Sequence, residues 1–169
     1  MSPTTGPASG GTRVTIEGKD LTGITIVQFG NQSLSPTAVS STKIIFVIPS
    51  IAGSGSDASQ QSVELESPGL SSPVPVGTFT YELPTVSSMS PRTGPAGGGT
   101  TVTIKGKDLT GITIVQLGNQ SMSPTAVSST KITFLTPAMS AGTGQKPHVA
   151  ITGGVLSSPV PVGTFTYGT

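Results

Sequence analysis

Cysteine and tryptophan are absent from this 169-residue chain, and aromatic residues are scarce, with five Phe and two Tyr. Without cysteine, the chain can form neither a disulfide nor a thiolate metal site. Charge is scarce too, because eight Lys and Arg against seven Asp and Glu leave a formal net charge of +1. A nucleic-acid-binding surface needs a cationic stripe, so no nucleic-acid partner is expected. No apolar run approaches the roughly 20 residues that span a bilayer, so no membrane span is expected.

Small and hydroxyl-bearing residues make up much of what is present, with 23 Gly, 15 Pro, 26 Thr and 24 Ser. Ala, Leu, Glu and Lys are too few for a helical bundle or a coiled coil. The near-zero net charge argues against a disordered chain. No signal peptide follows Met1, because the first residues form neither a basic nor an apolar region. The chain is therefore expected to be cytosolic, a mature form, exported by another route, or an excerpt.

An internal repeat is the strongest pattern in the sequence. Ser2–Pro49 aligns with Ser90–Pro137 at a constant offset of 88, and 39 of these 48 positions are identical. Leu70–Tyr81 then recurs without any change as Leu156–Tyr167. Missing such a repeat would misassign the whole fold, so the repeat is the starting point for the domain organisation.

The repeat length indicates how the chain divides into domains. A unit of about 86 residues is long enough to bury a small core of its own. We therefore predict two tandem domains, 1–82 and 83–169, joined by a short, stiff linker in which Pro84 fixes φ. The copies diverge between Ser50–Pro68 and Ala138–Gly154, a stretch that is typical of a loop followed by one strand.

Alternating apolar and polar residues predict an all-β fold for each unit. In Thr12–Gly18, Val14 and Ile16 face one side of a strand while Thr15 and Glu17 face the other. Short strands with turn signals every 8–12 residues or so indicate a β-sandwich. Further strands are predicted at Lys43–Pro49, Ser62–Glu66 and Val74–Tyr81.

A turn signal at Gly30-Asn31 predicts a hairpin between Thr25–Gly30 and Ser33–Ser40. The same asparagine and its twin Asn119 each begin an N-glycosylation acceptor triplet, Asn-Gln-Ser. Asparagine is also favoured in tight turns for backbone reasons, so the turn interpretation stands beside glycosylation.

Differences between the copies predict which side chains face outward. Ile45 becomes Thr133, which indicates an outward-facing position. Ile48 becomes Thr136, which indicates that this end of the strand is only partly buried.

The order of motifs resembles the IPT/TIG family of immunoglobulin-like domains. The resemblance rests on Ser90–Thr100 (SPRTGPAGGGT) and Val102–Leu109 (VTIKGKDL), then on Val115–Gly118, Lys131–Pro137 and the closing Phe165–Tyr167. It covers nearly the whole chain, twice. It implies two early-set, seven-stranded immunoglobulin-like β-sandwiches. It implies no single function, because the family occurs in bacterial surface proteins, polysaccharide enzymes, plexin-type receptors and Rel-type transcription factors.

The two copies differ at their beginnings. Pro84–Met89 is predicted to form the first edge strand of the second domain, whereas only Met1 precedes Ser2 in the first. The first domain is therefore expected to lack this strand, which would expose a neighbouring sheet edge. Two interpretations are open: the chain is cut from a longer array, or it is a subunit whose first domain docks against the next chain.

No constellation of residues predicts chemistry. The lone histidine, His148, cannot build a triad or a metal cluster by itself. Asp20 and its twin Asp108 are interpreted as turn residues whose side chains bond backbone N–H groups, with weak Ca²⁺ binding as the alternative. Gly94–Thr100 lacks the lysine of a phosphate loop and precedes a strand, so it is interpreted as a turn. We predict no catalytic, cofactor-binding or metal-binding residue.

A Lys–Asn isopeptide cross-link is a further possibility for a cysteine-free surface domain. Lys43 with Asn31, and Lys131 with Asn119, are the matched candidates. No acid at matched positions accompanies them, because Glu17 in the first copy is a lysine in the second. The cross-link is therefore disfavoured.

Two functions remain. The first is a non-enzymatic structural repeat of an extracellular or cell-surface bacterial fibre, filament, stalk or adhesin, elongated and assembling head to tail with identical repeats or subunits. The second is a module that binds a carbohydrate or a surface protein through residues 50–61 and 138–147, because loops carry recognition. The second lacks exposed aromatic rings, since all seven Phe and Tyr are predicted to lie in the core.

Overall fold

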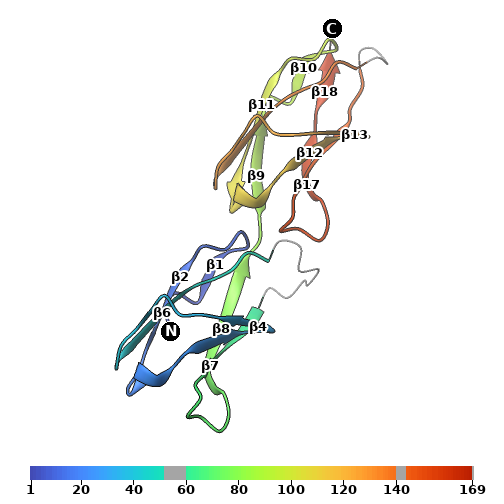
Figure 1. The fold of residues 1–169 in the computed structure, drawn as a ribbon. Helices are drawn as coiled ribbons and strands as arrows, with labels where there is room; N and C mark the ends of the chain where they lie inside the picture. Colours follow the sequence, from blue (N-terminus) through green and yellow to red (C-terminus); the bar gives the residue numbers. More distant parts are fainter. Residues whose placement is uncertain (52–59, 140–143, 169) are drawn as a thin grey trace. The chain divides into compact units, whose positions relative to one another are not determined.

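The computed structural model describes residues 1–51, 60–139 and 144–168 (Figure 1). These residues form β-strands and two single-turn 3-10 helices, η1 (Leu21–Gly23) and η2 (Leu109–Gly111). Contacts divide the chain into two compact units that part between Glu82 and Leu83. We call the part up to Glu82 unit 1 and the part from Leu83 unit 2. The predicted all-β, tandem fold is confirmed.

Unit 1 consists of two sheets. The strand orders are β1-β8-β7-β3-β4 in the five-stranded sheet and β2-β6-β5 in the three-stranded sheet. β1 pairs with β8 in parallel, and the remaining named pairs of this unit are antiparallel. The strands are β1 (Thr5–Pro7), β2 (Arg13–Glu17), β3 (Ile26–Phe29), β4 (Gln32–Leu34), β5 (Ala38–Val39), β6 (Lys43–Val47), β7 (Gln60–Glu66) and β8 (Val74–Glu82).

Unit 2 repeats this plan with ten named strands to the eight of unit 1, because β9 is added and the counterpart of β8 is divided into β17 and β18. Its sheets run β14-β15-β11-β9, β13-β12-β16-β17 and β10-β18, so β9 is an edge strand as predicted. Only Leu83 and Pro84 separate β8 from β9. The strands are β9 (Thr85–Ser90), β10 (Thr93–Pro95), β11 (Thr101–Lys107), β12 (Ile114–Leu117), β13 (Gln120–Met122), β14 (Ala126–Val127), β15 (Lys131–Leu135), β16 (His148–Thr152), β17 (Val160–Thr164) and β18 (Thr166–Gly168).

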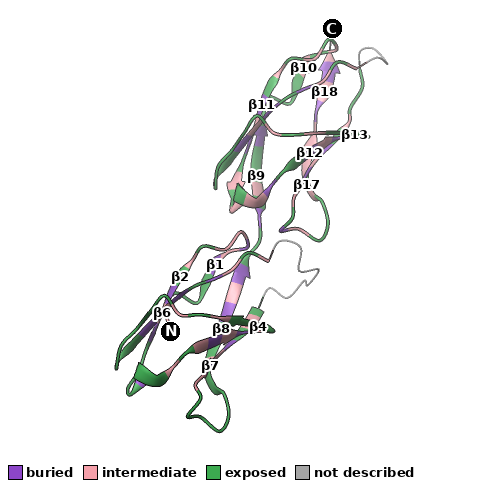
Figure 2. Ribbon diagram, viewed as in Figure 1, coloured by how far each residue is buried: buried purple, intermediate pink, exposed green. Residues whose placement is uncertain are grey.

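The core of each unit lies between its sheets, because alternate residues of every central strand point inward. In unit 1, Val14 and Ile16 of β2 pair with Phe46 and Ile44 of β6, and all four are buried. Figure 2 shows buried residues along the strands, interspersed with intermediate and exposed ones. The alternation in the sequence therefore marks the core correctly.

Every aromatic side chain of the protein is in a core, as predicted. Phe29, Phe79 and Tyr81 form edge-to-face pairs with ring centroids 5.5–6.0 Å apart, a preferred geometry for aromatic rings. In unit 2, where Leu117 replaces Phe29, one such pair remains at 5.1 Å. The seven aromatic residues are at most 3% exposed; they are Phe29, Phe46, Phe79, Tyr81, Phe134, Phe165 and Tyr167.

Two details of the sequence-based prediction are wrong. The segment Ser33–Ser40 is not one strand, because β4 pairs with β3 in one sheet while β5 pairs with β6 in the other. The end of the strand near Thr136 is also not half-exposed, since Ile48 and Thr136 are 1% and 3% exposed. The hydroxyl of Thr136 accepts a hydrogen bond from the Thr100 backbone N–H at 3.1 Å, which allows a polar side chain to be buried there.

The glycine run before β11 offers a test of the turn that it forms. Gly98 has a φ of +75°, and a Cβ there would collide with the Pro137–Ala138 backbone. Its neighbour Gly97 has open space around a Cβ. We expect Gly98→Ala to destabilise unit 2 by about 2 kcal/mol or more, because a left-handed backbone and a clash add up. Gly97→Ala is the matched control and should change the free energy of unfolding by less than about 0.5 kcal/mol. Equal effects in chemical denaturation would contradict this assignment.

Candidate functional site

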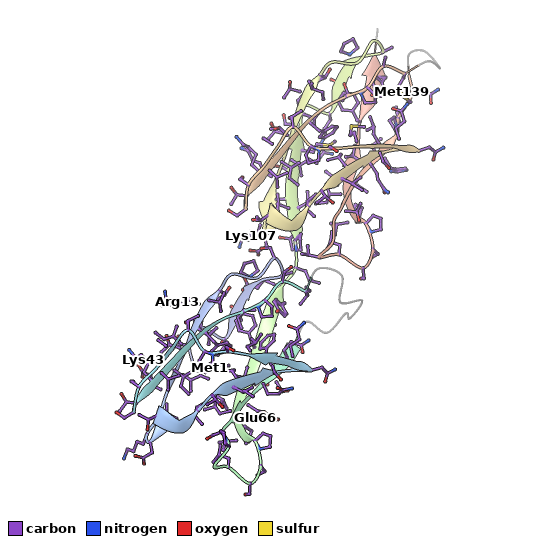
Figure 3. The ribbon with its side chains drawn as sticks, viewed as in Figure 1. Met1, Arg13, Lys43, Glu66, Lys107 and Met139 are labelled. Atoms are coloured by element: carbon purple, nitrogen blue, oxygen red, sulfur yellow. The ribbon has the colours of Figure 1, made fainter. Side chains whose placement is uncertain are left out.

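A groove with a volume of about 390 Å³ lies on unit 2 beside the divergent segment 138–147. One wall is the end of β12 and its turn into β13, at Leu117–Gln120. The other wall contains Met139 (labelled in Figure 3) and Gln145–Pro147. Residues 140–143 of this segment lie outside the described residues. We call this feature the hairpin groove.

Backbone hydrogen bonds hold both ends of the divergent segment. At its start, the Met139 N–H donates to the Ala96 carbonyl at 2.9 Å. At its end, the Tyr167 N–H donates to the Gln145 carbonyl at 2.9 Å, and the Phe165 N–H donates to the Pro147 carbonyl at 3.1 Å. The last strands of the sandwich therefore fix one wall of the groove.

The opposite wall is fixed by a tight turn. Gly118 has a φ of +59°, and its N–H donates to the His148 carbonyl at 2.8 Å. The turn presents Asn119 and Gln120 to solvent, and both are exposed. The predicted hairpin turn is thus present in unit 2, as it is in unit 1, where Phe29 pairs with Gln32 across Gly30-Asn31.

The side chains that line the groove are mainly hydrogen-bonding groups, with one titratable group among them. Asn119, Gln120 and Gln145 contribute amides, and Lys146 contributes an ammonium group. Leu117 forms part of the lining but is 1% exposed, so it offers little apolar surface. Such groups can bind hydroxyls or peptide groups, and no pair among them is suited to proton transfer.

The residues singled out from the sequence do not converge on one place. His148 is the exposed first residue of β16. Asp20 and Asp108 each precede a 3-10 helix with a φ of +55°, and neither side chain caps that helix. Aspartate suits these turn positions because it tolerates the left-handed backbone. Within the described residues, no group of three or more His, Cys, Asp or Glu could hold a metal ion.

The isopeptide candidates are also separated. Lys43 begins β6 in the three-stranded sheet, whereas Asn31 lies in the β3–β4 turn of the five-stranded sheet. Lys131 and Asn119 repeat this arrangement, and all four side chains are exposed. None of them has the buried environment that such a cross-link requires.

Comparison with known proteins identifies the family. The sequence model of the IPT/TIG domain matches residues 1–81 and again 84–167. The chain belongs to the IPT/TIG domain family. Human plexin-B1 is 34% identical over 113 residues, which are 64% of this chain and 5% of plexin-B1. The chain therefore spans a small part of this relative.

Solved structures share the fold of these IPT/TIG units. The extracellular region of plexin A4 superimposes with a TM-score of 0.51 and 21% identity, covering 98% of this chain and 17% of that one. A weaker likeness, with a TM-score of 0.45 and 23% identity, is to SGBP-B from a xyloglucan utilization locus in Bacteroides uniformis, over 95% of this chain and 46% of that one. In the described ranges, no helix is long and apolar enough to cross a membrane.

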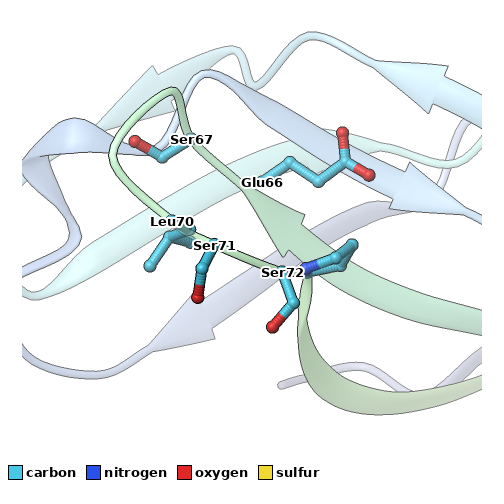
Figure 4. Close-up of a pocket in the computed structure, with 6 residues that line it drawn as sticks. Glu66, Ser67, Leu70, Ser71 and Ser72 are labelled. Atoms are coloured by element: carbon cyan, nitrogen blue, oxygen red, sulfur yellow. The ribbon is translucent and has the colours of Figure 1, made fainter.

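The turn of the first IPT/TIG unit that is equivalent to Leu117–Gln120 has different surroundings. At the equivalent turn, a Cβ on Gly30 would meet the side chain of Gln61, which therefore covers the position. Unit 1 has a hollow of about 180 Å³ at the β7–β8 connection (Figure 4). The sequence analysis missed this hollow; it is lined by Glu66, Ser67, Leu70, Ser71, Ser72 and Pro73.

The last strand of each IPT/TIG unit is tied to the start of the divergent segment through a tyrosine. The hydroxyl of Tyr81 donates to the Pro49 carbonyl at 2.6 Å, and that of Tyr167 to the Pro137 carbonyl at 2.8 Å. Burial raises the pKa of Tyr81 from 10.0 to about 12. Burial also raises the pKa of Tyr167, and a side-chain hydrogen bond with Thr136 partly opposes this.

These shifts predict how stability depends on pH. The pKa of Tyr81 is higher in the folded chain than in the unfolded chain, so its neutral hydroxyl stabilises the fold. This contribution to the free energy of unfolding is complete below pH 10 and is lost as the pH rises from 10 through about 12. Because the chain has two tyrosines and no tryptophan, ultraviolet absorbance of tyrosinate reports on these groups alone. We expect little ionisation near pH 10 and ionisation coupled to unfolding near pH 12. The chain unfolded in denaturant should titrate near pH 10, and the same behaviour in the folded chain would contradict the assignment.

Proposed function

We propose that this chain is a non-enzymatic structural repeat module of an extracellular bacterial fibre, filament, stalk or adhesin. Its partners are neighbouring identical repeats or subunits, with which it assembles head to tail. We extend to this chain the setting of plexin A4, whose solved region is extracellular. On this proposal the IPT/TIG units supply length and spacing rather than chemistry.

The observation that carries the proposal is the burial of every aromatic ring. Aromatic faces are the usual platform for stacking sugars and the usual anchors of protein interfaces. Here all five Phe and both Tyr are at most 3% exposed, and there is no tryptophan. Serine and threonine are the most frequent residues on the described surface, and their short hydroxyl side chains suit a solvated spacer.

The similarity of the two units also supports a spacer. The units differ at nine of the 48 positions between Ser2–Pro49 and Ser90–Pro137. One of these differences exchanges the exposed Glu17 for the exposed Lys105, and the pairing of Glu17 with Lys43 is kept as that of Lys105 with Lys131. Repeats whose role is to add length tolerate such exchanges of surface charge, because no ligand has to bind to that surface.

Scattering in solution tests the proposal directly. We expect the maximum dimension, measured by small-angle X-ray scattering, to grow by about 35–40 Å when one further copy of residues 83–169 is appended. The estimate follows from a rise of about 3.3 Å per strand residue plus the loops. This increase in maximum dimension is expected because only Leu83 and Pro84 connect the units, and so short a linker limits their folding back on each other.

A matched variant separates stiffness from simple mass. Inserting the four residues Gly-Ser-Gly-Ser after Glu82 should leave both units folded. The pair-distance distribution from scattering should become broader and its most frequent long distances should become shorter, because such linkers are flexible coils. A compact three-unit chain would overturn the spacer proposal. So would a distance distribution that is the same with and without the inserted residues.

A second candidate function is binding through the divergent loops 50–61 and 138–147. The hairpin groove favours it, because four hydrogen-bonding side chains meet there at the loop that differs most between the units. Residues 52–59 of the first loop lie outside the described residues. If soluble oligosaccharides shift the amide resonances of Asn119 and Gln145 and leave those of Asn31 unchanged, this function replaces the spacer.

A further inference from the structure

The formal net charge of +1 is the sum of opposite charges on the two units. Residues 1–82 contain three Lys and Arg against six Asp and Glu, which gives a formal net charge of −3. Residues 83–169 contain five against one, which gives +4. Two units with nearly the same fold and sequence therefore attract each other electrostatically when they belong to different chains.

The five-stranded sheet of unit 1 is acidic. Its described strands, β1, β8, β7, β3 and β4, contain three glutamates and no lysine or arginine. Glu64 and Glu66 (Figure 3) lie in β7, the central strand of this sheet, in which Val63 and Leu65 are buried. Because side chains alternate across a strand, both glutamates face the outer surface. We call the outer surface that bears Glu64 and Glu66 the acidic face.

The four-stranded sheet β14-β15-β11-β9 of unit 2 is basic. As described, its strands contain three lysines and no acidic residue. Lys105 and Lys131 lie directly opposite each other across β11 and β15, and Lys107 (Figure 3) follows Lys105 by two residues. Ile104 points into the core, so alternation places the three exposed lysines on the outer surface. We call this surface the lysine face.

The lysine face has an unfavourable charge arrangement within the unit. Like charges directly opposite each other destabilise an antiparallel strand pair, and Lys105 stands opposite Lys131. The twin of Lys105 is Glu17, which stands opposite Lys43. A spacer tolerates this exchange, and in an assembly of identical chains the exchange also creates a surface that favours an anionic partner.

The acidic face is specific to unit 1. The twin of Glu64 is Ala150, and the twin of Glu66 is Thr152. The matching strands of unit 2, as the structure describes them, contain no Asp, Glu, Lys or Arg. The core of this sheet is nevertheless kept, so the two glutamates are not needed to form it.

The spacing of the charges is the same on the two faces. Glu64 and Glu66 are two residues apart in β7, as Lys105 and Lys107 are in β11. A rise of about 3.3–3.4 Å per residue separates each pair by about 6.7 Å along its strand. Sheets that pack face to face keep their strand directions within about 30° of each other, so the two rows of charge can lie against each other.

We propose that the acidic face of unit 1 docks on the lysine face of unit 2 in a second copy of this chain. The inference rests on the proposed function, because it names the surfaces through which identical subunits assemble head to tail. Two different faces meet, so the contact is heterologous and continues into an open filament when the rotation does not close a ring. Exposed charges of this kind determine orientation and partner choice more than they add affinity.

Sedimentation equilibrium of the whole chain tests the contact. At 0.1 M salt the weight-average mass should increase with protein concentration. The association constant should fall about tenfold or more at 1 M salt, because the Debye length shortens from about 10 Å to about 3 Å. Glu64→Lys combined with Glu66→Lys should weaken the association by a similar factor of about ten, because it places like charges in the contact.

A second reversal and a mixture make the test specific. Lys107→Glu combined with Lys131→Glu should weaken the association as the glutamate reversal does. A mixture of the two reversed variants should associate about tenfold more tightly than either variant alone, because the reversed faces are complementary to each other. Lys19→Glu combined with Lys43→Glu changes the twin lysines of unit 1 and is the matched control, which should associate like the parent chain.

Several outcomes would overturn the docking of these faces. They are a chain that stays monomeric at every concentration, an association that no charge reversal weakens, a mixture that associates no better than its components, and a control that is weakened as much as the reversed variants. Association that survives every reversal would leave head-to-tail assembly standing through other surfaces. A monomeric chain would leave the spacer role to the separate scattering measurement on the three-unit chain.

Discussion

Each unit must close a core with few large side chains, and this shortage constrains the rest of the molecule. A domain of about 80 residues buries a modest fraction of its surface, so its stability is marginal. Unit 1 draws Phe29, Phe79 and Tyr81 together, and Tyr81 also ties its strand to the Pro49 carbonyl. All seven aromatic rings lie in the interior, and this burial is the basis of the proposed spacer function.

The strands that the sequence predicted best are those whose burial follows from local alternation. Val14 and Ile16 point inward because the strand period is two, and Gly30 adopts a φ of +55° that a tight turn needs. The split of Ser33–Ser40 could not be predicted in this way. Its two halves pair with β3 and β6 in different sheets, and local sequence does not encode a choice between two distant partners.

Thr136 shows a second limit of pattern reading. A threonine in place of Ile48 suggested exposure, yet the side chain is buried because its hydroxyl accepts a hydrogen bond from Thr100. The hairpin groove shows a third limit. Comparison of the repeats predicted its loop wall at Ala138–Pro147, whereas its other wall comes from Leu117–Gln120, which pairing of β12 with β16 brings alongside.

Leu70 and Val74 show how identical sequence can have different surroundings. Their twins in unit 2, Leu156 and Val160, are half-buried and pack against the core of that unit. Exposure at these positions is thus a property of what lies against the sheet, and sequence comparison between the units cannot detect it.

The central claim is that each unit closes its own core without help from the other. The most direct measurement is the unfolding of residues 83–169 as a separate chain, followed by amide hydrogen exchange and denaturant titration. The account predicts one cooperative transition, with the same free energy of unfolding and the same protection at Phe134 and Phe165 as in the whole chain. An isolated unit that is unfolded, or that loses protection at these core strands, would contradict it.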